Sequence, residues 1–87
     1  MANYELVFKK SVSKDLRSIP KRDFACILQR VKALQENPRP DGSEKLSGQE
    51  RYRIRQGVYR ILYEVTDGLL VVTVVKVGHR THVHRRR

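Results

Sequence analysis

The segment from Arg51 to Tyr63 alternates between arginine and large apolar residues, reaches a turn, and then alternates again. Period-two alternation is typical of β-strands whose two faces meet different surroundings. We interpret the segment as a β-hairpin in which Gln56 and Gly57 form a two-residue loop. In this register Arg53 lies opposite Arg60 on the neighbouring strand. The pattern therefore predicts antiparallel sheet in the middle of the chain.

The two faces of the predicted hairpin differ in chemistry. One face carries large apolar side chains that we expect to be buried: Tyr52, Ile54, Tyr59, Ile61 and Tyr63. The other face carries arginines, with no carboxylate among them until Glu64: Arg51, Arg53, Arg55 and Arg60. Like charges that lie opposite each other destabilise a sheet by up to about 1 kcal/mol. Because ordinary solvated faces mix both signs, the arginine-bearing face indicates binding to a polyanion.

The length and the charge distribution support the same interpretation. A chain of 87 residues predicts one domain, residues 1–87, with a thin core. The formal net charge is +10, of which residues 1–50 carry +3 and residues 51–87 carry +7. A basic C-terminal part on a small domain is typical of proteins that bind nucleic acid, an acidic protein, or both.

Cysteine content and hydropathy bear on the location of the chain. The single cysteine, Cys26, excludes an intramolecular disulfide, and a reducing cytoplasm is the simplest location for such a chain. No apolar run approaches the length that crosses a membrane, and the N-terminus lacks the apolar region of a signal peptide. We therefore expect a cytoplasmic protein with no membrane partner.

The spacing of apolar residues and turn signals predicts the order β-α-α-β-β-β. The expected elements are a strand at 4–8, a helix at 12–19, a second helix from Pro20 to Gln35, the arginine hairpin, and a strand at 69–77 after a turn at Asp67 and Gly68. Residues 38–50, rich in Pro, Gly and Ser, are expected to form a loop. This order predicts an α+β fold in which a helical hairpin packs on one face of a small, mainly antiparallel sheet. The arginine-bearing face would remain open.

Four motifs in this order resemble the RelE toxins of bacterial type II toxin–antitoxin systems. They are Leu46-Ser-Gly48, Tyr52-Arg-Ile-Arg55, Gly57-Val-Tyr-Arg-Ile-Leu-Tyr63 and Val77-Gly-His-Arg80. The resemblance covers nearly the whole chain and implies a RelE-like fold. It also implies a ribosome-dependent endoribonuclease that cuts mRNA in the ribosomal A site, with no metal or other cofactor. A RelB-like antitoxin is the implied protein partner.

The resemblance places the family's active-site basic residues on arginines of this chain: Arg53, Arg55, Arg60 and Arg80. The family commonly has lysines at the first two of these positions, and a tyrosine where His84 stands here. In RelE toxins a ribose 2′-OH attacks the adjacent phosphate, which leaves a 2′,3′-cyclic phosphate and a 5′-OH. This chemistry requires a base, an acid, and donors that stabilise the developing negative charge.

The departures from the family pattern change the expected roles. Arginine binds phosphate oxygens through its planar fork, but its pKa above about 12 prevents it from acting as a base. We therefore assign proton transfer to His84 first and His82 second, because histidine titrates near neutral pH. Arg60 and Arg80 are expected to stabilise charge on the scissile phosphate. Flanking phosphates are assigned to the remaining arginines: Arg51, Arg53 and Arg55.

Other roles for these residues remain open at the level of sequence. A zinc site at His79, His82 and His84 is one alternative, but three histidines without cysteine in so basic a segment give a weak metal signal. Glu64 is expected to form an ion pair rather than to act as a base. Two alternative functions share the fold: a ParE-like inhibitor of DNA gyrase, and a basic RNA-binding module without catalytic activity.

Overall fold

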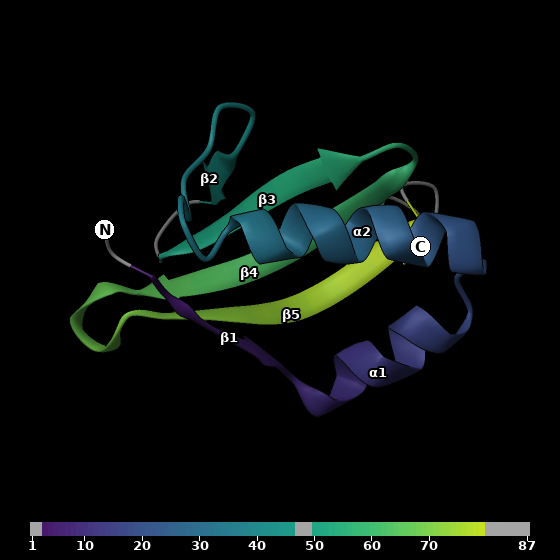
Figure 1. Cartoon of the computed structure of the whole chain (residues 1–87), viewed down its shortest axis with the longest axis horizontal. Coiled ribbons are helices and arrows are strands. Elements are labelled where there is room, and N and C mark those ends of the chain that lie inside the picture. The colour runs from purple at the N-terminus through teal and green to yellow at the C-terminus, as the bar shows by residue number, and fades with distance from the viewer. Residues whose placement is uncertain (1–2, 47–49, 80–87) are drawn as a thin grey trace.

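The computed structural model describes residues 3–46 and 50–79. Within these residues the chain forms two α-helices and a five-stranded sheet (Figure 1). The elements in chain order are β1 (Glu5–Phe8), α1 (Lys10–Arg17), α2 (Lys21–Ala33), β2 (Glu44–Leu46), β3 (Arg51–Gln56), β4 (Tyr59–Thr66) and β5 (Val71–His79). A short 3₁₀ turn, Asp67–Leu69, joins β4 to β5.

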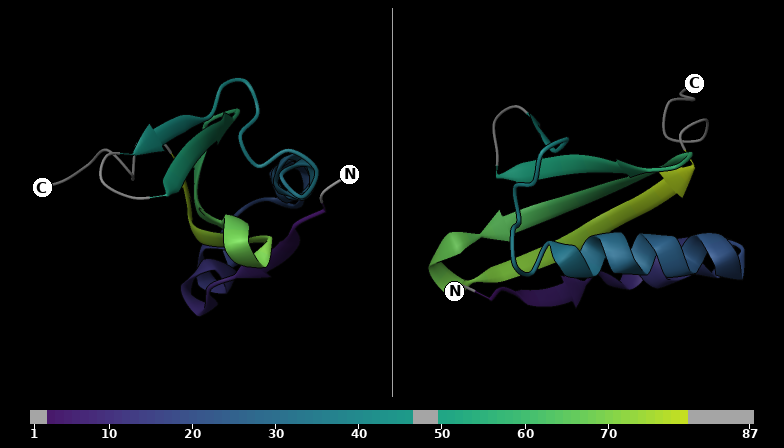
Figure 2. Two further views of the ribbon diagram at one scale, coloured as in Figure 1. Left: turned by 90° about the vertical axis from the view of Figure 1, so that its left-hand side faces the viewer. Right: turned by 45° about the horizontal axis from the view of Figure 1, so that its top comes forward.

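The sheet has the strand order β1-β5-β4-β3-β2. β1 pairs with β5 in parallel, and the remaining pairs are antiparallel. α2 lies across one face of the twisted sheet, while α1 continues from the end of β1 and packs alongside β5 (Figures 1 and 2). The predicted α+β fold is therefore confirmed. β2 is an addition to it, in the segment that was expected to be a loop.

The helices form where the apolar spacing predicts them. Pro20 separates them and stands at the N-cap of α2, a position where a missing backbone N–H costs nothing. On the apolar side of α1, Val12 is fully buried. In α2 the buried positions are Ile27 and Val31, with Leu34 at its end. Cys26 lies outside these buried positions and is exposed.

The core lies between the helices and the apolar face of the sheet. It contains all five hairpin residues that the alternation assigned to it: Tyr52, Ile54, Tyr59, Ile61 and Tyr63. Tyr63 is the largest fully buried side chain, and its hydroxyl donates a 2.7 Å hydrogen bond to the carbonyl oxygen of Pro38. Burial raises the pKa of Tyr63 to about 12. The loop after α2 is thus fastened to the centre of the sheet.

The register of the arginine hairpin differs from the predicted one by two positions. Gln56 pairs with Tyr59, so the loop consists of Gly57 and Val58. Gly57 has a φ of +61°, while Val58 does not have a positive φ. Glycine at the first loop position is the requirement of a type II′ turn, which follows the right-handed twist of the strands. A shift of two positions preserves side-chain parity, and the predicted division into an apolar and an arginine face is therefore confirmed.

The connection from β4 to β5 was also predicted incorrectly. Instead of a two-residue loop, four residues join the strands, and Leu70 adopts the left-handed conformation with a φ of 54°. The side chain of Leu70 is 43% exposed and lies outside the core. Further along, a bulge between Leu62 and Tyr63 leaves Val75 without a register partner. Beyond the bulge the parity of β5 changes, which brings Val77 into the core.

An ionic network ties together the end of the sheet away from the hairpin loop. Arg39 bonds Asp67 at 2.8 Å and Glu50 at 3.2 Å, and its Nε donates to the Tyr52 hydroxyl at 2.8 Å. The hydroxyl of Tyr4 donates to Asp67 at 2.8 Å. These contacts join the start of β1, the loop after α2 and the β4–β5 connection. The hydrogen bonds from Arg39 hold the pKa of the Asp67 carboxyl below its ordinary value.

This network predicts a loss of stability in acid. A carboxyl whose pKa is lower in the folded than in the unfolded protein stabilises the fold fully above the unfolded pKa, about 4 for Asp. The contribution disappears as the pH falls through the folded pKa of Asp67. Urea unfolding of the wild type and of Asp67→Asn should therefore differ above pH 4 and converge towards pH 2. A constant difference across this range would contradict the role of the ionised carboxylate.

Candidate functional site

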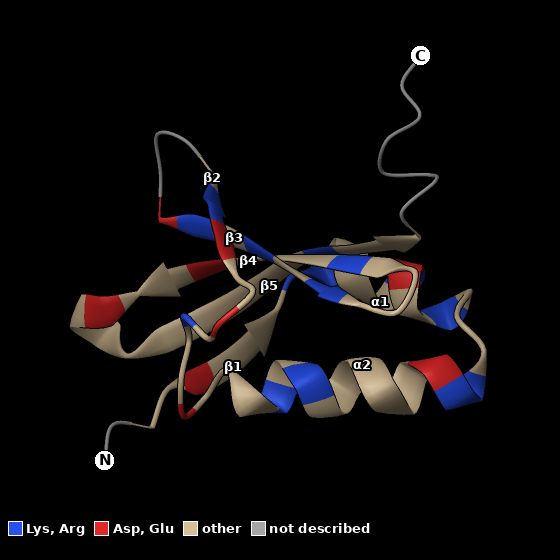
Figure 3. Ribbon diagram, turned by 90° about the horizontal axis from the view of Figure 1, so that it is seen from above, with Lys and Arg blue, Asp and Glu red and all other residues tan. Residues whose placement is uncertain are grey.

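Basic residues lie along the sheet (blue in Figure 3), and the register of β3 and β4, with their alternate residues in the core, places the arginine side chains on the face turned away from α2. We call it the arginine face and define it by Arg51, Arg53, Arg55 and Arg60. In the observed register Arg60 lies directly opposite Arg55, rather than opposite Arg53. On its other side Arg60 pairs with Gly78 of β5, which carries no side chain. The sheet therefore sets two guanidinium-bearing residues next to each other on neighbouring strands, close to the hairpin loop.

The members of this pair differ in exposure. Arg55 is exposed to solvent, whereas Arg60 is only 8% exposed, although the register places it on the face away from α2. A buried guanidinium is held in a defined position, and charge interactions are stronger where water is excluded. Of the described arginines, Arg60 thus has the environment best suited to stabilising charge at a fixed point.

Two carboxylates also lie on the arginine face. Arg51 donates to Oε2 of Glu64 through Nε, at 3.2 Å, and through Nη2. The ion pair expected for Glu64 is thus confirmed. Arg53 donates to Oε1 of Glu44 through Nε, at 3.0 Å, and through Nη2. The expectation that carboxylates are absent before Glu64 is wrong, because pairing of β2 with β3 brings Glu44 opposite Arg53.

Glu44 is the site residue that sequence reasoning missed. Hydrogen bonds from Arg53 hold the pKa of its carboxyl below the ordinary value, and the positive charges of Arg55 and Arg60 lower that pKa further. Its side chain therefore lies within the electrostatic reach of three arginines. β2 has only three residues, too few for an alternating pattern to be recognised. The signal that could have located it is the turn at Asp41 and Gly42, where Gly42 has a φ of +94°.

The remaining predicted site residues lie near the C-terminus. Arg80, His82 and His84 lie outside the described residues, so their placement relative to the arginine face stays a prediction. His79, the last residue of β5, packs edge-on against Tyr59, with ring centroids 5.7 Å apart. Tyr59 belongs to the apolar face, so His79 lies on the side of the sheet opposite the arginines.

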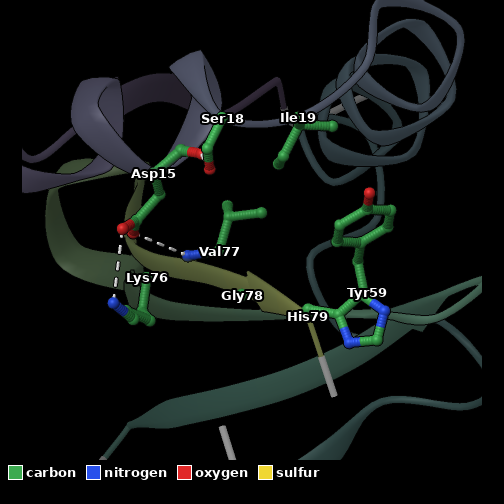
Figure 4. A pocket seen from close by; sticks show the side chains of 8 residues that line it. All are labelled: Asp15, Ser18, Ile19, Tyr59, Lys76, Val77, Gly78 and His79. Carbon is green, nitrogen blue, oxygen red and sulfur yellow. Dashed lines mark hydrogen bonds and ion pairs between the residues drawn. The ribbon is translucent and has the colours of Figure 1, made fainter. Parts of the chain in front are cut away.

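A separate cleft of about 330 Å³ lies beside the end of β5 (Figure 4). Asp15 of α1 accepts hydrogen bonds there from Lys76 Nζ and from the backbone N–H of Val77, each at 3.3 Å. These contacts cover the edge of β5 beyond the end of β1, an edge that would otherwise be open to pairing. None of the arginine-face residues lines this cleft. Its hydrogen bonds join α1 to β5, which is a structural role.

Residues 3–46 and 50–79 contain no group of three His, Cys, Asp or Glu side chains placed to hold a metal ion. None of the helices in these residues combines the length and the apolar character needed to cross a bilayer.

Comparison with known proteins gives a consistent assignment. Residues 6–83 match a family model described as the ParE toxin of type II toxin–antitoxin systems, parDE. Toxin RelG of Mycobacterium tuberculosis (strain ATCC 25618 / H37Rv) is 29% identical over 87 residues, which cover 95% of this chain and 98% of RelG.

Superposition on solved structures supports the same assignment. A chain of the toxin–antitoxin complex RelBE2 from Mycobacterium tuberculosis superposes with a TM-score of 0.79 and 26% identity, covering 90% of this chain and 99% of that one. A chain of the archaeal RelE–RelB complex from Pyrococcus horikoshii OT3 superposes with a TM-score of 0.78 and 29% identity. The match covers 92% of this chain and 97% of that one. The resemblance to RelE toxins is thereby confirmed. The chain belongs to the ParE toxin family of type II toxin–antitoxin systems, within the RelE/ParE superfamily.

Proposed function

We propose that this toxin is an endoribonuclease that cuts mRNA on the ribosome, by attack of a ribose 2′-OH on the adjacent phosphate. The observation that carries the proposal is the Arg55–Arg60 pair on the arginine face, next to the hairpin loop. Like charges set opposite each other destabilise a sheet, and a bound polyanion would offset that cost. A ribose–phosphate backbone supplies the matching negative charge, and the similarity to toxins named RelE supports this choice of ligand.

The roles follow from the environment of each residue. Arg60, held at 8% exposure, stabilises the charge that develops on the scissile phosphate. Exposed Arg55 binds the neighbouring phosphate. Arg53 and Arg51 bind further phosphates once they release the carboxylates of Glu44 and Glu64. Exposed ion pairs of this kind contribute only about 0–1 kcal/mol, so their exchange for phosphate is inexpensive. Guanidinium groups supply the positive charge in this mechanism, which therefore requires no metal.

Three residues complete the proposed mechanism. Arg80 is the second donor to the scissile phosphate. His84, with His82 as its alternate, moves the proton between the 2′-OH and the leaving 5′-oxygen. An imidazole can accept and donate a proton near neutral pH, whereas a guanidinium keeps its proton and can serve as neither base nor acid.

A RelB-like antitoxin is the proposed partner. The RelBE2 and the archaeal RelE–RelB structures are complexes of toxin with antitoxin. The charge of this chain, +10 overall, favours a partner segment rich in Asp and Glu. Such a segment would neutralise the toxin by covering the arginine face or by displacing structure beside it. Both the ribosome and the antitoxin place the site of action in the cytoplasm.

Induced expression with primer extension tests the proposal against its alternatives. A ribosome-dependent nuclease yields cuts at codon-linked positions in translated mRNA and leaves the same transcript intact when its start codon is removed. The family model that matches the chain carries the ParE name, so gyrase inhibition is the specific alternative. An SOS response with intact mRNA would establish that alternative. Intact mRNA without an SOS response would favour the non-catalytic RNA-binding module.

A further inference from the structure

Glu44 places a negative charge within the cluster that the proposed function assigns to RNA phosphates. Its carboxylate accepts two hydrogen bonds from Arg53, and it lies within electrostatic reach of Arg55 and Arg60. The backbone pairing of β2 with β3 sets this position, because Glu44 is the register partner of Arg53. The placement is thus built into the sheet rather than being a chance contact of two surface side chains.

A carboxylate and a phosphate are alternative ligands for the same guanidinium group. Arginine binds either through its planar fork, and both contacts use the same N–H donors. Arg53 directs the Nε–H and one Nη2–H to Glu44, so this edge of its planar fork is closed to a phosphate while that contact lasts. The Arg53 side chain is 27% exposed and that of Glu44 is 53% exposed, so solvent and ligand reach the pair.

Two features make this contact reversible. An ion pair that is open to solvent contributes little free energy, because water screens it and because both long side chains lose rotamer freedom. β2 is also a three-residue strand at the edge of the sheet, paired on one side only. The carboxylate can therefore leave Arg53 without disturbing the hairpin that holds the arginines.

We propose that the Glu44 carboxylate occupies one phosphate position of the RNA site and must be displaced from Arg53 before RNA binds. This inference rests on the proposed function. The contact acts as an internal competitor, which lowers the apparent affinity by the fraction of molecules in which the site is occupied. A free RNA strand meets this competition directly. An mRNA held next to the toxin by the ribosome overcomes it through high effective concentration. Glu44 would thus disfavour RNA outside the ribosome.

The test compares RNA affinities of Glu44→Gln and Glu36→Gln. Both variants remove one negative charge, but Glu36 is an exposed residue beyond α2 and makes no contact with the arginine face. The probe is a short, fluorescently labelled, single-stranded oligoribonucleotide with 2′-O-methyl groups, which cannot be cut by 2′-OH attack. We expect Glu44→Gln to bind this probe roughly three- to tenfold more tightly than the control. Its plot of log K against log salt should be steeper by about 0.7, the value for one additional phosphate contact on a single strand.

The outcomes separate this inference from the proposed function. Equal affinities of the two variants, weaker binding by Glu44→Gln, or no binding of the probe by any form would overturn the inference. A Glu44→Gln protein that binds like the control but cuts ribosome-bound mRNA far more slowly would also overturn it, and would assign the carboxylate to the chemistry. By contrast, wild-type protein that leaves ribosome-bound mRNA intact overturns the proposed function, whatever Glu44 does to the affinity for the probe.

Discussion

Replacement of Arg60 by alanine is expected to lower the single-turnover rate of mRNA cleavage on programmed ribosomes by about 10²–10³-fold. Arg60 lies opposite Arg55 and is nearly buried, so its guanidinium is held in place to serve as the donor that the proposed mechanism assigns to the scissile phosphate. Removal of one positioned donor from such a site costs about 3–4 kcal/mol of transition-state stabilisation. The measurement is quench-flow cleavage of an end-labelled mRNA with toxin in excess over ribosomes.

Two controls separate this effect from charge and from stability. Arg17→Ala removes the same charge from the exposed last turn of α1, and it should cut at close to the wild-type rate. Arg60→Lys keeps the charge but loses the planar fork, so an intermediate rate is expected. Circular dichroism and urea unfolding establish that each variant is folded. If folded Arg60→Ala cuts as fast as Arg17→Ala, the role given to Arg60 is wrong.

Replacement of Ile61 by alanine should lower the free energy of unfolding by about 2–5 kcal/mol. Ile61 follows Arg60 on β4 but points to the opposite face, where it is fully buried between its register partners Ile54 and Val77. Deletion of three carbons leaves a cavity that the surrounding strands cannot close. Because a small domain is stabilised by only about 5–15 kcal/mol in total, the loss is a large share.

Urea unfolding followed by circular dichroism measures this loss. The matched variant Ile61→Val should lower the free energy of unfolding by only about 0.5–1.5 kcal/mol. The adjacent positions 60 and 61 should behave in opposite ways. Arg60→Ala should affect the rate far more than stability, and Ile61→Ala should affect stability while the rate per folded molecule changes little. A loss below 1 kcal/mol for Ile61→Ala would show that the core is not centred on this face.

The two faces of the hairpin were predictable because side-chain parity depends only on strand type. Tyr52 and Ile54 must share a face whichever loop closes the hairpin. The register was not predictable to the same degree. It depends on which loop position takes a positive φ, and Gly57 supplies that at the first position rather than the second. The alternation in sequence is the same for both choices.

The features that were missed arise from how neighbouring strands pair, and not from a pattern within one strand. β2 is too short to show a period, and its position is set by pairing with β3. The bulge opposite Leu62 and Tyr63 likewise depends on how β5 fits β4, not on a pattern in either strand. These two features have the largest consequences for the site. The first brings Glu44 to the arginines, and the second turns His79 away from them.

The most direct test of the account is cleavage of an mRNA that carries a single 2′-deoxy nucleotide at the mapped cut position in the ribosomal A site. The proposed mechanism uses that hydroxyl as the nucleophile, so we expect no cut at the modified position. The all-ribose mRNA should be cut to a 2′,3′-cyclic phosphate and a 5′-OH. Equal cleavage of both mRNAs would contradict the proposed attack by the 2′-OH. An intact all-ribose mRNA, together with inhibition of DNA gyrase by the same preparation, would replace RNA with gyrase as the target.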